Sequence, residues 1–237
     1  MQKTKLAIAG NLLINKPAGL SSFQCVKKVR YESRVQKVGH AGTLDPFAQG
    51  LMLIAVGKTY TKQISSIVDM SKTYWVSMIL GISTNTLDSY GQVEDVEPLA
   101  KAIAMDEIKS ILQSFLGKQE QVPPKFSAKK INGKRAYDLA RNNEDVVLKP
   151  ASIEIYDIEL LSIYESEFPE IQFNVTCSKG TYVRTLVEDI AKKLGTIAYT
   201  KDLIREKIGN FDLDESLDFK DISEKNLTEL LQFYGRR

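Results

Sequence analysis

The sequence predicts a protein of the α+β class, because strand-like and helix-like segments are mixed without a regular strand–helix–strand alternation. Alternating apolar and polar residues favour strands at 11–15, 72–80, 152–162 and 171–177. Apolar residues three and four positions apart favour helices from Ser21 or Ser22 to about 34, and at 106–116, 181–194 and about 225–233. A single compact unit, 1–237, is expected because the sequence contains no repeat, low-complexity segment or Pro/Ser-rich linker.

The first elements are set by turn and cap residues. The strand at 11–15 is closed by the turn Lys16-Pro17-Ala18-Gly19. Ser21 or Ser22 can cap the helix that follows, whose apolar residues Phe23, Val26 and Val29 share one face. Residues 39–50 are then dense in glycine and proline, which predicts a loop.

The later elements follow the same rules. The helix at 106–116 has an apolar face and ends before Gly117. Val122-Pro123-Pro124 must be extended and irregular, because each proline disfavours a helical residue before it. The helix at 181–194 has apolar residues on its inner face and ends before Gly195.

Composition excludes several classes of protein. The longest apolar run, Leu51–Val56, is far shorter than a membrane-spanning helix, and Gly10 interrupts the N-terminal apolar stretch, which argues against a secretory signal. Cys25 and Cys177 are too few for a disulfide framework, so a reducing cytoplasm is expected. One histidine and two separated cysteines do not make a zinc site of the usual kind, and we expect no metal.

Charge is unevenly distributed along the chain. The formal net charge is only +2, but residues 1–80 hold 11 Lys/Arg against 3 Asp/Glu, a net of +8. Residues 121–150 and 171–210 are also basic, at +4 and +3, whereas 151–170 carries −6. Such blocks can form one positive face that binds a polyanion, or they can be ordinary solvated charge.

The segment 37–50, KVGHAGTLDPFAQG, combines the single histidine with one carboxylate, Asp45. Positive neighbours favour the ionised form of a carboxylate, which can act as a nucleophile or a base. Glycine and proline allow the backbone to approach a ligand closely. The alternative is a turn aspartate that bonds its own backbone before Pro46.

Residues 39–46, GHAGTLDP, resemble the signature loop of the TruB family of tRNA pseudouridine synthases. Other family motifs are matched in order: the N-terminal motif by 15–22, the tyrosine strand by Lys72-Thr73-Tyr74, the central motif by 122–128 with 132–137, the basic motif by 177–184, and the following strand by Leu203-Ile204-Arg205. The match is collinear from about Asn11 to Phe211, most of the chain.

This resemblance implies the pseudouridine-synthase catalytic fold, a mixed and mostly antiparallel sheet with flanking helices. It implies an isomerase, an intramolecular transferase that converts a T-loop uridine of tRNA, conventionally position 55, to pseudouridine. No cofactor is implied; the RNA partner is the tRNA T arm, and we expect a monomer. Many bacterial members carry a C-terminal PUA domain, which we do not expect in a chain of 237 residues.

The resemblance also implies roles for single residues. Asp45 is the nucleophile, and His40 fills the place in the base stack that the flipped uridine leaves. Tyr74 lies against the uracil, and Arg184 pairs with the aspartate. The same residues also have ordinary interpretations: a buried histidine, a core tyrosine and a solvated helix arginine.

Further family positions carry over less directly. Tyr182 and Leu203 match positions that line the nucleotide pocket, and Asp88 is placed to position the arginine. Asn85 stands where the family has an acid, and Gly57–Lys62 is one residue longer than the family pattern. Candidate phosphate contacts, each of which can equally be solvated charge, are Lys16, Lys62, Lys129, Lys130, Lys134, Arg135 and Lys179.

Two other functions remain open from the residues. A non-catalytic RNA-binding protein on the same scaffold would not need Asp45 and Arg184 together. A nucleic-acid N-glycosidase would need a second carboxylate and a water site, and the matched segments contain no convincing pair of carboxylates.

Overall fold

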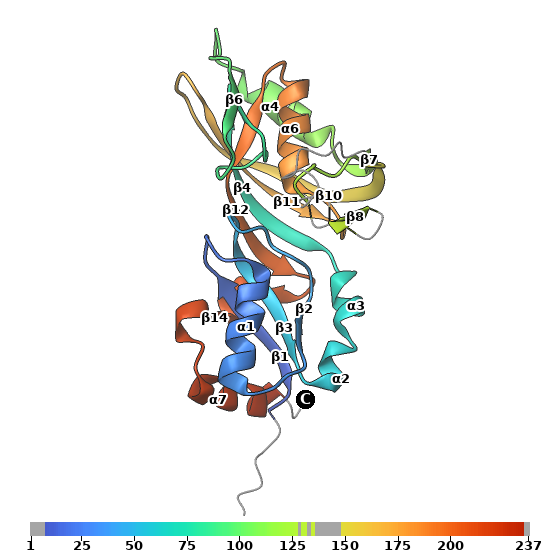
Figure 1. Cartoon of the computed structure of the whole chain (residues 1–237). Helices are drawn as coiled ribbons and strands as arrows, with labels where there is room; N and C mark the ends of the chain where they lie inside the picture. Colours follow the sequence, from blue (N-terminus) through green and yellow to red (C-terminus); the bar gives the residue numbers. More distant parts are fainter. Residues whose placement is uncertain (1–7, 128, 132–133, 136–147, 235–237) are drawn as a thin grey trace, which may run out of the picture. The chain divides into compact units, whose positions relative to one another are not determined.

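The computed structural model describes residues 8–127, 129–131, 134–135 and 148–234. The chain forms two compact units, one made of residues 1–72 with 204–237 and the other of residues 73–203. We call them unit 1 and unit 2 and describe each by itself. The elements mix strands and helices without regular alternation, which confirms the predicted α+β class (Figure 1).

Unit 1 is built around strand β3. Its strands are β1 (Gly10–Lys16), β2 (Val38–His40), β3 (Gln49–Val56), β13 (Phe211–Asp212), β14 (Leu217–Asp218) and the second half of β12 (Ala198–Ile208). Strand β1 pairs antiparallel with β3 along its whole length and parallel with β14. The other edge of β3 pairs antiparallel with β2 at one end and parallel with β12 at the other. Strands β1, β2 and β12 therefore meet at β3, and β12 comes from near the other end of the chain.

Gly50 makes the pairing of β3 with β12 possible. It lies opposite Arg205, and a Cβ atom there would stand only 2.8 Å from the backbone nitrogen of Arg205. Its φ of +104° also lies in a region that residues other than glycine rarely adopt. Only glycine fits this close contact, which brings Arg205 beside the start of β3.

Helices cover the unit 1 sheet. They are α1 (Ser22–Ser33), α2 (Lys58–Thr61), α3 (Ile64–Val68) and α7 (Glu224–Tyr234), with short 3-10 turns η1 (Leu213–Glu215) and η2 (Phe219–Asp221). Helix α1 begins with a capping box, in which Ser21 and Gln24 satisfy each other's backbone N–H groups. It contacts α7 and β2, and α7 also contacts β1 (Figure 1). An apolar cluster that includes Leu51, Leu53 and Ile208 forms part of the core.

Unit 2 carries the segments that match the central motif, 122–128 with 132–137, and the basic motif, 177–184. Its elements are β4 (Lys72–Leu80), β5 (Ile82–Thr84), β6 (Val93–Val96), α4 (Met105–Gln113), β7 (Gly117–Gln121), β8 (Lys130–Ile131), β9 (Lys134–Arg135), β10 (Ala151–Tyr164), β11 (Glu170–Cys177) and α6 (Val183–Lys193). The sheet runs in the order β12-β4-β11-β10-β7, with β10 antiparallel to both neighbours. Helix α4 packs against β10 and α6.

Most elements expected from periodicity are present within a few residues of the expected bounds. The strand expected at 11–15 is β1, the helix expected from Ser21 or Ser22 is α1, and Val122-Pro123-Pro124 is irregular. The elements that were not expected include strands β2, β3, β5, β6, β7, β13 and β14 and helices α2 and α3. Whether the two units act as the single domain 1–237 stays a prediction. Among the described residues, no helix has both the length and the apolarity to cross a membrane.

Candidate active site

Asp45 lies in unit 1 on the loop that joins β2 to β3. The peptide groups before it are held by Ser22, the first residue of α1. The buried Ser22 hydroxyl donates to the Leu44 carbonyl at 2.9 Å and accepts from the Leu44 N–H at 2.8 Å. One side chain thus satisfies both backbone groups of the residue next to Asp45.

Arg205 of β12 holds the same loop from another side. Its side chain is only 1% exposed. Its Nε donates to the Leu51 carbonyl at 2.8 Å, and its Nη atoms make longer bonds to the Thr43 carbonyl at 3.4 Å and the Gly42 carbonyl at 3.3 Å. The planar guanidinium presents its donors in a rigid fork, so one side chain holds three carbonyls in a fixed geometry.

Lys16, the last residue of β1, holds the loop beyond Asp45. Its side chain is fully buried, and its Nζ donates to the carbonyls of Pro17 at 2.9 Å, Leu20 at 2.8 Å and Pro46 at 3.3 Å. Burial lowers the pKa of Lys16 to about 8, whereas the negative charge of Asp45 acts in the opposite direction. A buried ammonium with three carbonyl partners has no surface to offer a phosphate. We therefore correct the expected phosphate contact of Lys16 to a positioning role.

Two further backbone bonds complete the loop. The Pro46 carbonyl also accepts from Gly19 N–H at 2.8 Å, and the Asp45 carbonyl accepts from Ala48 N–H at 3.2 Å. Backbone groups of Gly42, Thr43, Leu44 and Pro46 are therefore hydrogen-bonded to other parts of unit 1, and the Asp45 carbonyl is bonded to Ala48 within the same loop. The half-buried Asp45 side chain is carried by a backbone with few alternative conformations.

His40 is the last residue of β2 and lies two residues before Gly42, the first residue whose carbonyl Arg205 binds. Burial lowers the pKa of its imidazole; the Gly42 backbone raises it, and the charge of Arg205 lowers it further. The half-buried ring is therefore neutral at pH 7. A neutral imidazole offers a flat, uncharged surface on which a base can stack.

In unit 2 the structure brings Arg184 and Asp88 together. Arg184 lies in the first turn of α6 and is only 3% exposed, so the interpretation as a solvated arginine is wrong. Its Nη1 stands 3.5 Å from Asp88 Oδ2, and its Nη atoms donate to the carbonyls of Thr86 at 2.6 Å and Phe126 at 2.9 Å. Asp88 is itself fixed, because its Oδ1 accepts from Thr86 Oγ1 at 2.7 Å and Tyr90 N–H at 3.0 Å.

The other expected nucleotide contacts also lie in unit 2. Tyr74 on β4 is buried, with 8% of its surface exposed, and Leu203 on β12 is 5% exposed. Tyr182 precedes α6, and its backbone is held by Gln121, whose amide donates to the Tyr182 carbonyl at 3.1 Å and accepts from its N–H at 2.8 Å. Their roles toward a nucleotide stay predictions.

The remaining phosphate candidates differ in exposure. Lys62, after α2, and Lys179 are exposed, and Lys129 is half-buried. The side chains of Lys130, Lys134 and Arg135 lie outside the described residues, as do Ala128, 132–133 and 136–137 of the central motif. Among the described residues, no three His, Cys, Asp or Glu side chains are grouped closely enough to hold a metal ion.

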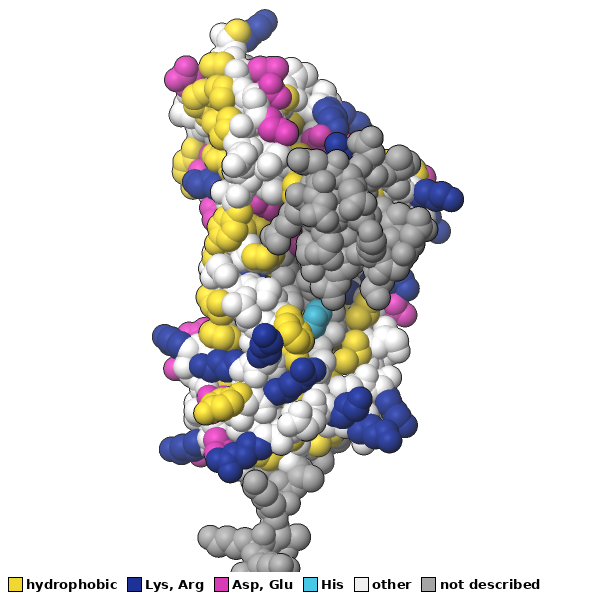
Figure 2. All heavy atoms as spheres, viewed as in Figure 1, with side chains coloured by type: hydrophobic (Ala, Val, Ile, Leu, Met, Phe, Trp, Pro, Cys, Tyr) yellow, Lys and Arg dark blue, Asp and Glu magenta, His cyan; other side chains and the backbone are white. Residues whose placement is uncertain are grey.

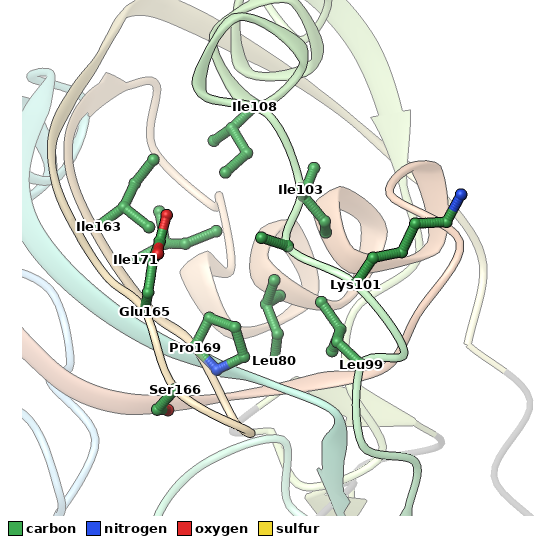
Figure 3. A pocket seen from close by; sticks show the side chains of 11 residues that line it. Leu80, Leu99, Lys101, Ile103, Ile108, Ile163, Glu165, Ser166, Pro169 and Ile171 are labelled. Atoms are coloured by element: carbon green, nitrogen blue, oxygen red, sulfur yellow. The ribbon is translucent and has the colours of Figure 1, made fainter.

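A pocket of about 170 Å³ in unit 2 does not coincide with these residues (Figure 3). Its walls are mainly apolar, and Lys101 and Glu165 are the only titratable residues that line it. It contains none of the motif residues, so we place the candidate active site at the Asp45 loop and not in this pocket.

Comparison with known proteins shows the family to which the chain belongs. The TruB family pseudouridylate synthase model, which describes an N-terminal domain, matches residues 30–183. The tRNA pseudouridine synthase B of Bacillus velezensis is 43% identical over 220 residues, covering 92% of this chain and 71% of that protein. The protein of the same name from Aquifex aeolicus is 42% identical over 221 residues, covering 93% of this chain and 76% of that protein. The chain belongs to the TruB family of pseudouridylate synthases.

Solved structures show the same fold. A Cbf5–Nop10–Gar1 complex matches 90% of this chain with a TM-score of 0.68 and 26% identity. An H/ACA RNP bound to a substrate RNA containing 2′-deoxyuridine matches 90% with a TM-score of 0.66 and 23% identity. This chain spans about half of those two proteins, 53% and 51% respectively.

The burial of Lys16 predicts a specific pH dependence of stability. Because its pKa is lowered to about 8 in the folded chain, the unfolded chain binds more protons between about pH 8 and 10.5. The contribution of Lys16 to the free energy of unfolding therefore rises across that interval, by on the order of 3 kcal/mol. Urea denaturation at several pH values should show this rise in the wild type and not in Lys16→Met. The exposed Lys58→Met is the control and should keep the wild-type slope; equal slopes in Lys16→Met and wild type would contradict the assignment.

Proposed function

We propose that this chain is a tRNA pseudouridine synthase that isomerises a T-loop uridine, conventionally position 55, with Asp45 as the nucleophile. The observation that carries the proposal is a carboxylate on a loop whose flanking backbone is fixed by Ser22, Lys16 and Arg205. Membership of the TruB family and the activity for which its relatives are named supply the reaction class.

The reaction rearranges one nucleoside without adding or removing an atom. The C1′–N1 glycosidic bond breaks, the uracil turns, and a C1′–C5 bond forms while the proton on C5 is lost and N1 gains one. The enzyme is therefore an isomerase, and no redox partner or energy source enters the balance. An ionised carboxylate can form a covalent intermediate that divides this step into two easier ones.

Access to the uridine requires base flipping. A base stacked in a folded loop must leave the stack at a cost of a few kcal/mol before its glycosidic bond can be reached. We assign His40 to the vacated position, because its neutral ring can stack on the neighbouring bases without introducing a charge.

The proposed contacts to the flipped nucleotide come from unit 2. Tyr74 lies against the uracil, and Tyr182 and Leu203 line its pocket. Arg184 acts on Asp45, and Asp88 is its positioning residue, which the 3.5 Å ion pair between their side chains supports. The phosphate contacts come from Lys62, Lys129, Lys130, Lys134, Arg135 and Lys179.

We further propose that the chain works as a monomeric, single-domain enzyme in the cytoplasm. Cys25 and Cys177 are buried and form no disulfide, which fits a reducing compartment. Gel filtration coupled to light scattering measures the molecular mass directly; a dimer mass at micromolar concentration would contradict the monomer.

Asp45→Asn should abolish turnover and leave tRNA affinity within about tenfold of wild type, because the nucleophile is lost while the backbone and phosphate contacts remain. Pseudouridine formation is measured in purified tRNA, and affinity by filter binding. Asp69→Asn, another carboxylate change in unit 1, is the control and should keep wild-type activity. Turnover by Asp45→Asn at a measurable fraction of the wild-type rate would refute the assigned role. A wild-type chain that binds tRNA without forming pseudouridine would favour the non-catalytic RNA-binding alternative.

Recognition should be concentrated on the T arm, because the proposed contacts surround the flipped uridine and its flanking phosphates. We expect kcat/KM for a T-arm hairpin to lie within about 10³-fold of that for whole tRNA under one salt condition, a difference of roughly 4 kcal/mol. A larger discrimination against the hairpin would show that distal parts of the tRNA are read as well.

A further inference from the structure

Helix α1 leads directly away from the Asp45 loop. Its first residue, Ser22, is hydrogen-bonded to Leu44, and the next residue, Phe23, is 52% exposed. Lys27 and Tyr31 follow at intervals of four residues on the same face, and Tyr31 is 81% exposed. We call Phe23, Lys27 and Tyr31 the α1 track. Eight residues of helix make it about 12 Å long.

We propose that the α1 track binds unpaired nucleotides beside the target uridine, with bases stacked on Phe23 and Tyr31 and a phosphate held by Lys27. This inference rests on the proposed function, because it takes the RNA to be the substrate held at Asp45. It assigns a binding surface to a part of the chain that none of the motif residues occupies.

The exposure of the two aromatic rings is the first argument. An aromatic side chain gains most of its stabilising energy from burial, yet these two present half or more of their surface to solvent. Every nucleobase has a flat face that can cover such a ring, and this contact needs no particular sequence. The two rings are spaced along a helix axis, as a stacking surface for successive unpaired bases would be.

The charge around the rings is the second argument, and it favours RNA over an apolar protein partner. Lys27 Nζ lies 5.1 Å from the centre of the Phe23 ring, and Arg30 Cζ lies 5.8 Å from it. Helix α1 carries four basic residues with its C-cap, Arg34, against one acid, Glu32. In Figure 2 many Lys and Arg side chains and few acidic ones are visible over unit 1. Cations beside exposed rings are typical of surfaces that bind single-stranded nucleic acid.

The proposal is tested by coupling each ring to a base. Wild type, Phe23→Ala and Tyr31→Ala are titrated with a T-arm hairpin and with hairpins that carry one abasic nucleotide at each loop position in turn. We expect each alanine variant to lose about 5- to 100-fold in affinity for the intact hairpin, the range of one stacked base. For each ring, one abasic hairpin should lack the base that stacks on it. On that hairpin the wild type and the alanine variant should differ in affinity by less than twofold, because the base that stacks on the ring is absent in both cases.

Matched variants separate stacking from other effects. Phe23→Tyr keeps a ring and should keep affinity within threefold, whereas Tyr156→Ala removes a tyrosine of unit 2 that is equally exposed, at 52%, and should change nothing. Lys27→Ala should lower the slope of log affinity against log salt by about one unit. Circular dichroism and thermal melts confirm that each variant is folded.

The outcomes are distinct from those of the proposed function. Affinities of Phe23→Ala and Tyr31→Ala within twofold of wild type, or losses that are equal for every abasic hairpin, would overturn the proposal. Equal losses would instead point to a structural effect of the rings, and unchanged RNA binding would leave a protein partner as the occupant of this face. Failure of the wild type to form pseudouridine would refute the proposed function. The affinities of the wild type and the variants for intact and abasic hairpins could still be compared, so the test of the α1 track would stand.

Discussion

The structure of unit 1 depends on how the backbone around Asp45 is hydrogen-bonded. A loop that is partly buried must find partners for its N–H and C=O groups, or each unpaired group costs on the order of 1 to 3 kcal/mol. Here the partners come from three elements: Ser22 at the start of α1, Lys16 at the end of β1 and Arg205 in β12. Strand order, the glycine at position 50 and the cap of α1 all serve to bring these three donors to one loop.

Two of the three donors are buried cations, which is an expensive solution. Each desolvated charge is unfavourable unless it is well paired, and the charge of Arg205 lowers the pKa of Lys16 further. Backbone carbonyl groups accept the hydrogen bonds of both cations, and the charge of Asp45 also favours the protonated form of Lys16. Such cost is typical of catalytic sites, where fixed geometry is worth more than local stability.

The sequence predicts much of this fold because periodicity is a local signal. Strand β1 alternates and α1 has a cap and an apolar face, so both were expected. Strand β3 was missed, since almost every residue in it is buried and an unbroken apolar run has no alternation to read. The glycine- and proline-rich motif predicted that Asp45 lies on a loop, and in the structure it lies on the loop between β2 and β3.

The supports of that loop could not be predicted in the same way. Arg205 reaches Gly42 and Thr43 from more than 160 positions along the chain, and only the pairing of β12 with β3 shows why. Lys16 was expected either as a phosphate contact or as solvated charge, and both expectations assume an exposed side chain, whereas tertiary packing has buried it. Arg184 could equally have been solvated, and its burial with Asp88 depends on segments almost 100 residues apart.

The central claim is that the buried donors position Asp45 without touching the RNA, and Arg205→Lys tests it most directly. Lysine keeps the positive charge but has a single nitrogen, which cannot replace the Nε and two Nη atoms with which Arg205 holds three separate carbonyls. Single-turnover rates of pseudouridine formation should fall at least about tenfold, while tRNA affinity stays within about threefold. Lys207→Arg, an exposed change on the same strand, should leave both unchanged. A variant that loses affinity as much as rate, or that loses neither, would contradict the account.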